Sequence, residues 1–138
     1  MKRIFLALAM TATLFGCSNT SDKKADTKAL MDEIMQIHNK VMASDEKLMQ
    51  NKMKLDTLLK NANLPAKDTA ALISTKLVAA DSAMENWMHK FEPDPKGKTD
   101  DEVTGYLNDQ KKQITAIDSK ITTAIAQSDK YLLKVKSK

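Results

Sequence analysis

Three stretches of this chain carry apolar residues at the spacing of an α-helix, and a segment containing proline and glycine separates the last two. In each stretch the apolar residues recur mainly three, four or seven positions apart, which places them on one side of a helix. No stretch shows the alternation that is typical of a β-strand. Residues 92–98, EPDPKGK, hold two of the three prolines, so a continuous helix cannot cross them. The sequence therefore predicts long helices that fold back on one another.

The predicted architecture is an all-α, antiparallel three-helix bundle with up-down-up topology. The bundle domain covers residues 26–138, with helices at about 27–62, 65–91 and 99–135. Pro65 fits the first turn of the second helix. Thr99 and Glu102 form a capping-box pattern at the start of the third. An extended coiled-coil oligomer is the alternative, and the prolines of the second connection favour the fold-back.

The predicted core consists of the periodic apolar residues. In the first helix these are Leu30, Ile34, Ile37, Val41, Leu48 and Leu55. In the second they are Ile73, Leu77, Ala80, Met84, Trp87 and Phe91. In the third they are Val103, Leu107, Ile114, Ile117, Ile121, Ile125, Leu132 and Val135. A mature domain of this size can bury enough surface to fold without disulfides.

The first residues are apolar without helical period. Lys2 and Arg3 precede a nearly unbroken apolar run at 4–12, which is shorter than the roughly 20 residues of a membrane-spanning helix. This pattern is typical of a secretory signal peptide. The run closes on LFGC, residues 14–17, which resembles the lipobox of bacterial lipoproteins, although Phe15 stands where a small residue is usual. An ordinary signal peptide and an uncleaved anchor are the alternatives.

The lipobox resemblance implies a signal peptide at residues 1–16 and a lipidated Cys17 as the first mature residue. Two or three acyl chains on that cysteine would hold the protein permanently in a lipid bilayer, whereas one alone is marginal. The implied location is the bacterial cell envelope. Ser18 stands where sorting rules place Asp for inner-membrane retention, which favours the outer membrane. Residues 17–25 are polar and without period, and we expect a lipidated cysteine followed by a short tether.

Composition argues against several function classes. Without Lys2 and Arg3, the chain keeps 20 of its 22 basic residues, all lysines, against 18 acidic residues. No arginine remains to read bases or phosphates bidentately, so we expect no nucleic-acid partner. Cys17 is the only cysteine, which leaves no disulfide or thiolate in the domain. No nucleophile motif, glycine-rich phosphate loop or carboxylate pair predicts catalysis, and we expect neither an enzyme nor a cofactor.

MENWMHKF, residues 84–91, concentrates soft and aromatic side chains. On a helical wheel Met84, Trp87, Met88 and Phe91 lie around the core direction, while His89 points away. Met88 and His89 therefore cannot bind one ion from a regular helix. We predict core packing here, with His89 outside.

The first helix carries a second stripe of soft side chains. Its members are Met31, Met35, His38, Met42, Met49 and Met53. One interpretation is a second packing seam in a helix with two neighbours, filled by adaptable thioethers. Another is a Cu(I) site, since thioether and imidazole suit that ion, with Met31, Met35, His38 and Met42 as ligands. A third is an exposed methionine-rich surface for a partner.

Two stretches, IMQIHNKVM (34–42) and AMENWMHKF (83–91), carry a resemblance to a protein family. Behind a lipobox and ahead of a long third helix, they resemble small bacterial lipoproteins that are often labelled "viral A-type inclusion protein". The resemblance covers roughly residues 28–133. It implies an exported, lipid-anchored helical protein, and it carries no activity, cofactor or partner. We therefore expect a non-enzymatic binding or structural module with an envelope protein as partner, and soft-metal binding as the alternative.

Overall fold

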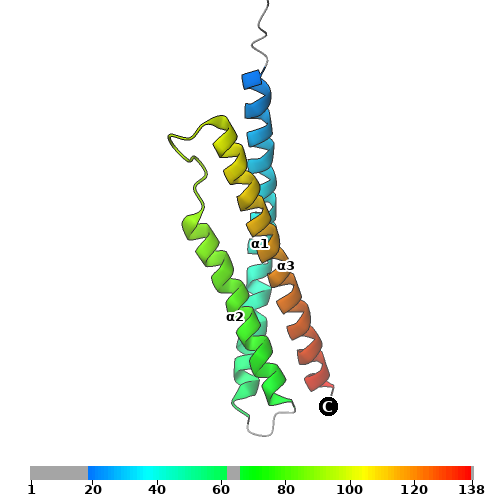
Figure 1. Ribbon diagram of the computed structural model, residues 1–138. Helices are drawn as coiled ribbons and strands as arrows, with labels where there is room; N and C mark the ends of the chain where they lie inside the picture. The colour runs from blue at the N-terminus through cyan, green and yellow to red at the C-terminus, as the bar shows by residue number, and fades with distance from the viewer. Residues whose placement is uncertain (1–18, 62–65, 138) are drawn as a thin grey trace, which may run out of the picture.

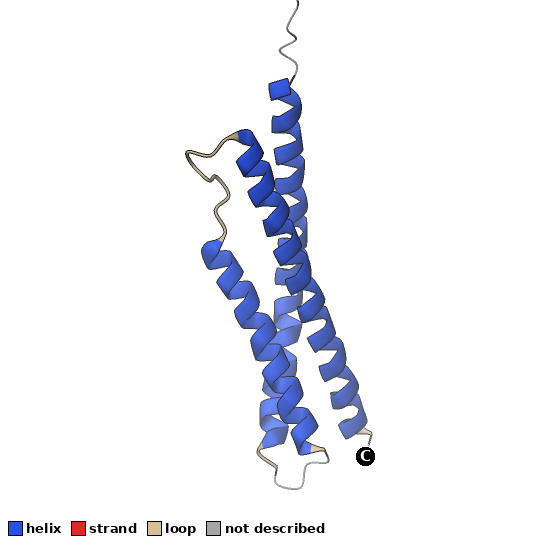
Figure 2. Ribbon diagram, in the orientation of Figure 1, coloured by secondary structure: helices blue, strands red, loops and turns tan. Residues whose placement is uncertain are grey.

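The computed structural model describes residues 19–61 and 66–137, which form three α-helices (Figure 1). α1 spans Asn19–Leu59, α2 spans Lys67–Lys90 and α3 spans Asp100–Lys136. No strand occurs within these described ranges (Figure 2). The helices pack against one another as a bundle, which confirms the predicted all-α fold. None of the three is both long enough and apolar enough to cross a membrane. The predicted signal peptide, Cys17 and Pro65 lie outside the described residues.

α1 begins earlier than the sequence pattern predicts. Its first residue is Asn19, so the segment 19–25, predicted as part of a tether, is helical. No proline or glycine occurs anywhere in α1, so nothing in its sequence interrupts the helix. The first turns project beyond α2 and α3 (Figure 1). A helix without a neighbour needs no apolar side, and periodicity therefore could not reveal these turns.

The two connections differ in how they end and begin helices. Ala66 precedes α2 in a left-handed conformation, with φ 52°. Phe91 caps the end of α2, and its N–H donates to the Trp87 carbonyl at 2.9 Å. The predicted capping box opens α3: Thr99 N–H donates to Glu102 Oε2 at 2.8 Å, and Glu102 N–H donates to Thr99 Oγ1 at 3.4 Å. Gly97 takes φ 79° in the longer connection, where a side chain would be strained.

The core consists largely of the predicted apolar positions. Those with less than a tenth of their surface exposed are Ile34, Val41, Leu48, Leu55, Ile73, Leu77, Ala80, Met84, Trp87, Leu107, Ile114, Ile117 and Ile121. The remaining predicted members, among them Leu30, Ile37 and Phe91, are half-buried and pack against this cluster. Burying one large apolar side chain stabilises the fold by about 1.5–3 kcal/mol. The shared apolar core is therefore the main source of stability.

α1 and α3 run parallel, and ion pairs follow their shared edge. Between described residues the pairs are Glu33 with Lys111, Lys40 with Asp118 at 2.7 Å, and Lys47 with Asp129 at 2.8 Å. Residue numbers rise together on both helices, as up-down-up topology requires. Each exposed pair contributes at most about 1 kcal/mol. Their regular order nevertheless assigns one side of α1 to α3.

A polar layer interrupts the core between α1 and α3. Asn51 and Ser128 are both fully buried. Asn51 Nδ2 donates to Ser128 Oγ and to Asp129 Oδ1, each at 2.8 Å, and Ser128 Oγ donates to the Ile125 carbonyl at 2.7 Å. Asn51 Oδ1 is buried without a partner among the described residues. A buried asparagine of this kind favours one helix register over others, at a cost in stability.

Candidate functional site

The side of α1 away from the ion pairs faces α2. Asp56 Oδ1 accepts a hydrogen bond from Ser74 Oγ at 3.0 Å near the end of α1. About five turns earlier along α1, the ring centroids of His38 and Trp87 lie 6.1 Å apart. Residue numbers fall along α2 as they rise along α1, so these two helices are antiparallel. The predicted methionine stripe lies along this α2-facing side of α1 and the solvent-facing side next to it.

Most of the stripe is exposed. Met31 is half-buried against the core, and His38 is half-buried. The other four members are exposed, with 38%, 41%, 38% and 65% of their surface accessible in Met35, Met42, Met49 and Met53. The interpretation of the stripe as a second packing seam is therefore wrong for these four methionines. The physical reason is that α2 contacts only the edge of the stripe, because the inner side of α2 is otherwise occupied by core residues. The other two interpretations both require accessible thioethers, which this arrangement supplies.

An aromatic row crosses the three helices beneath one end of the stripe. Trp87 of α2 lies beside His38, and its ring stacks on Phe91 with centroids 4.7 Å apart. Phe91 in turn lies 6.4 Å from Tyr106 of α3. The Glu92 N–H donates to the Tyr106 hydroxyl at 2.7 Å. This row fixes the end of α2 against both neighbours and gives His38 a rigid apolar support.

The prediction for residues 84–91 is confirmed in its main part. Met84 and Trp87 expose only 4% and 5% of their surface, and His89 is exposed. Met88 differs, because it exposes 39% and lies at the border of the core arc rather than within it. The Trp87 Nε1 is buried, and no described residue accepts a hydrogen bond from it.

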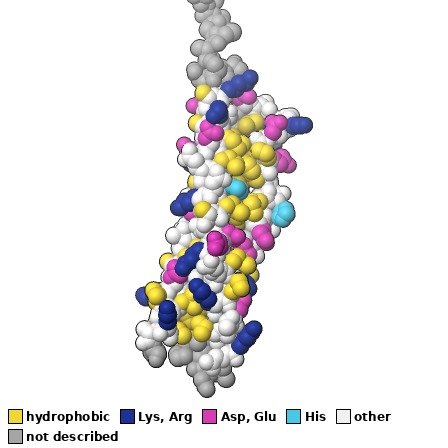
Figure 3. Space-filling view, turned by 180° about the vertical axis from the view of Figure 1, so that it is seen from behind, with side chains coloured by type: hydrophobic (Ala, Val, Ile, Leu, Met, Phe, Trp, Pro, Cys, Tyr) yellow, Lys and Arg dark blue, Asp and Glu magenta, His cyan; other side chains and the backbone are white. Residues whose placement is uncertain are grey.

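Met88 lies on the edge of α2 that faces the stripe. Asp81, one heptad before it, is close enough to Asp45 of α1 for the two charges to interact. Because the helices are antiparallel, one heptad beyond Asp81 on α2 corresponds to one heptad before Asp45 on α1, which is His38. We call Met31, Met35, His38, Met42 and Met88 the methionine face. Figure 3 shows hydrophobic side chains gathered around a histidine on this side of the molecule.

Acidic residues border the methionine face. Burial, followed by the charges of Glu85 and Asp45, raises the pKa of Asp81 above its usual value. Asp81 with the neighbouring charges of Glu85 and Asp45 marks a surface with local negative potential. Figure 3 shows acidic side chains below the apolar patch. A cationic group on a ligand or partner would be favoured at this border.

The chemistry of the methionine face suits a soft cation better than a hard one. The described part of the chain contains no cluster of three or more His, Cys, Asp or Glu residues placed to hold a metal ion. The candidate ligands Met31, Met35, His38 and Met42 lie on one side of α1. His38 Nδ1 lies 3.1 Å from Asn39 Oδ1. With its proton on Nδ1, the imidazole presents the Nε2 lone pair as a ligand, and thioethers complete a set that suits Cu(I).

Two hollows lie at the opposite end of the bundle, and helical periodicity predicts neither. One, of about 550 Å³, lies between the start of α2 and the end of α3. The other, of about 990 Å³, lies between the ends of α1 and α3, with Met53 and Leu133 on its walls. The sequence signal was the run YLLKVK at 131–136, in which apolar residues occur more densely than one helix side can bury.

No family model, no curated protein and no solved structure matches this chain.

Proposed function

We propose that this protein is a lipid-anchored lipoprotein of the bacterial cell envelope, with the outer membrane as its location, and that its bundle is a non-enzymatic binding module. The lipobox-like residues 14–17 support the anchor. The methionine face supports the binding role, and its exposure is the observation that carries the proposal. Soluble domains seldom expose several large apolar side chains together without a use for them.

An apolar segment of an envelope protein is the partner that this face fits best. Methionine side chains adapt to different partner surfaces because they are unbranched and polarisable. Trp87 and Phe91 beneath them form a rigid base. The acidic border around Asp81 favours a partner segment with lysine or arginine beside its apolar residues.

Cu(I) binding is the second candidate, and one observation favours it. Met35 and Met42 are not used in the core, although leucine would serve an apolar surface equally well. They lie one turn either side of His38 on the same helix side. In an oxidising envelope compartment, thioether and imidazole are the soft ligands that remain when no cysteine is available.

The anchor is tested in cells that carry the native chain or the Cys17→Ser variant. Growth with radiolabelled palmitate followed by membrane fractionation should label the native protein and recover it with membranes. The variant should incorporate no label and leave the outer-membrane fraction. A labelled variant would overturn the lipid anchor, as would a native protein that takes up no palmitate.

The binding role is tested with substitutions that separate apolar contact from metal ligation. Met35→Leu with Met42→Leu keeps the apolar surface and removes the thioethers, whereas Met35→Lys with Met42→Lys removes both. A photoactivatable side chain at the exposed Asn39, one turn from both methionines, should crosslink one partner in the native chain and in the Leu variant, and none in the Lys variant. Met53→Leu with Met53→Lys provides the matched control on the same helix.

The same variants decide the metal alternative. The purified protein is titrated with Cu(I) against a chromogenic chelator. If the face binds only a protein partner, neither the native chain nor any variant should compete with the chelator for Cu(I). Stoichiometric Cu(I) binding that is lost in the Leu variant and in His38→Gln would favour the metal function instead. If the Lys variant crosslinks as well as the native chain and no variant binds Cu(I), neither role belongs to the methionine face.

A further inference from the structure

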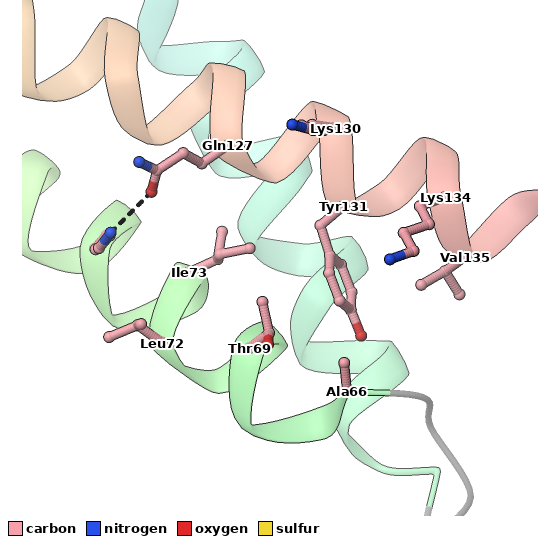
Figure 4. Close-up of a pocket in the computed structure, with 10 residues that line it drawn as sticks. Ala66, Thr69, Leu72, Ile73, Gln127, Lys130, Tyr131, Lys134 and Val135 are labelled. Atoms are coloured by element: carbon pink, nitrogen blue, oxygen red, sulfur yellow. Dashed lines mark hydrogen bonds between the residues drawn. The ribbon is translucent and has the colours of Figure 1, made fainter.

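The hollow between α2 and α3 has the chemistry of a site for an anionic amphiphile. Thr69, Leu72 and Ile73 form its α2 wall, and Tyr131 and Val135 belong to its α3 wall. Figure 4 shows the Tyr131 ring reaching from α3 toward the first turn of α2. Leu72 exposes 57% of its surface, although it is a large aliphatic side chain. The inner surface is therefore mainly apolar, and Leu72 is its most exposed large apolar side chain, whereas Ile73 and Tyr131 are buried at its base.

The rim of this hollow is cationic. Lys76, Lys130 and Lys134 line it, and no carboxylate does. Lys76 Nζ donates to Gln127 Oε1 at 2.9 Å and bridges the two walls (Figure 4). Lys130 and Lys134 occupy consecutive turns of α3, where like charges repel each other. Neither forms an ion pair with another described residue.

We propose that this hollow binds a single acyl chain with an anionic head group, such as a free fatty acid or a lysophospholipid. The acyl chain would lie on Leu72, Ile73 and Val135, and the carboxylate or phosphate would pair with Lys130 and Lys134. A hollow of about 550 Å³ has the size of a small-molecule site. A protein partner would need a much larger surface, about 800 Å² on each side. This inference does not depend on the proposed function, because the methionine face lies at the other end of α2.

The test is calorimetric titration of the full chain with palmitate and with palmitoyl lysophosphatidate, both below their micelle concentrations. Lys130→Gln with Lys134→Gln removes two charges of the rim, and Leu72→Ser shortens the apolar wall. All three positions are exposed or on the rim, so these variants should fold. Lys96→Gln with Lys98→Gln removes two exposed charges from the connection before α3 and is the matched control.

Binding of one ligand per chain is expected, with at least about tenfold weaker affinity in the double lysine variant and in Leu72→Ser. The control should bind as the native chain does, and the methyl ester of palmitate should bind more weakly than palmitate. Tighter binding of palmitate would identify free fatty acids as the natural ligand class. Tighter binding of lysophosphatidate would identify lysophospholipids instead. Absence of saturable binding would overturn the proposal, as would equal binding of the methyl ester or unchanged affinity in both site variants.

Discussion

Asn51→Asp tests whether the polar layer between α1 and α3 holds the register of the bundle. The two side chains have nearly the same shape, so the exchange replaces a donor group by an acceptor without opening a cavity. In the native protein Asn51 Nδ2 lies 2.8 Å from both Ser128 Oγ and Asp129 Oδ1. The variant places a carboxylate oxygen at this position, facing the Asp129 carboxylate from a fully buried site.

The expected loss in free energy of unfolding follows from the contacts that the variant loses. The hydrogen bond to Ser128 contributes about 0.5–1.5 kcal/mol and the charge-assisted bond to Asp129 about 1.5–3 kcal/mol. The variant also leaves a buried charge without compensation, a change that costs about 3–5 kcal/mol in comparable cases. These terms overlap, and we expect the free energy of unfolding to fall by about 3–5 kcal/mol at pH 7.

The loss in free energy of unfolding caused by Asn51→Asp should depend on pH. Burial and the neighbouring Asp129 charge raise the pKa of the new carboxyl group in the folded state. Such a group contributes its full stability below its unfolded pKa of about 3.9, and that stability is lost as the pH rises through the folded pKa. The gap between variant and native protein should therefore narrow as the pH falls from 7 toward 4.

Urea unfolding followed by helix circular dichroism at pH 7 and pH 4.5 measures both effects. Asn108→Asp is the matched control, since Asn108 is exposed on α3 and its Nδ2 donates to the Thr104 carbonyl at 3.0 Å. The control should lose less than about 1 kcal/mol. A loss of that small size in Asn51→Asp, or an equal loss at both pH values, would refute the buried polar layer.

Two further predictions concern the N-terminus of α3 and the loss of stability at low pH. Thr99→Ala should lower the free energy of unfolding by about 0.5–2 kcal/mol in urea unfolding, and adding Glu102→Gln should cost little more because the two residues form one cap. Hydrogen bonds from Lys52 and Ser74 lower the pKa of Asp56 despite its partial burial. Burial raises the pKa of Asp129, but hydrogen bonds from Lys47 and Asn51 outweigh it, so that this pKa is also lowered. Both carboxylates therefore stabilise the fold above pH about 4 and lose that contribution as the pH falls through their folded pKa values; thermal melts from pH 7 to 2.5 should show a drop in Tm that is smaller in Asp129→Asn.

The sequence predicts the bundle well because helical period and core packing are the same physical fact. Ile34, Val41, Leu48 and Leu55 recur at seven-residue spacing and are all nearly fully buried. The capping box at Thr99 is also local, since donor and acceptor lie within one turn. In both cases the residues that determine the structure are close in sequence or share one helix side.

Features that depend on a neighbour's position were not predictable in this way. A methionine at the edge of a helix is buried or exposed according to how far the adjacent helix reaches, and its own sequence is the same in both cases. Asn51 follows the spacing of the core, yet only its partner Ser128, on a helix far along the chain, shows that the position holds a polar layer. The hollow beside Leu72 likewise depends on where two distant helix ends meet.

The distribution of residues around α1 links the stability of the bundle to its surface. One side of α1 carries Glu33, Lys40 and Lys47, whose ion pairs and nearby polar layer specify α3 as a parallel neighbour. The opposite side carries methionines where a stable bundle would gain more from leucine or from charge. Exchanging the exposed thioethers should therefore leave register and stability nearly unchanged, because the α3-facing side determines the register and the shared apolar core supplies most of the stability. A chain that keeps its fold while its methionine side varies is what a binding module requires, since its partner surface can then change independently of its core.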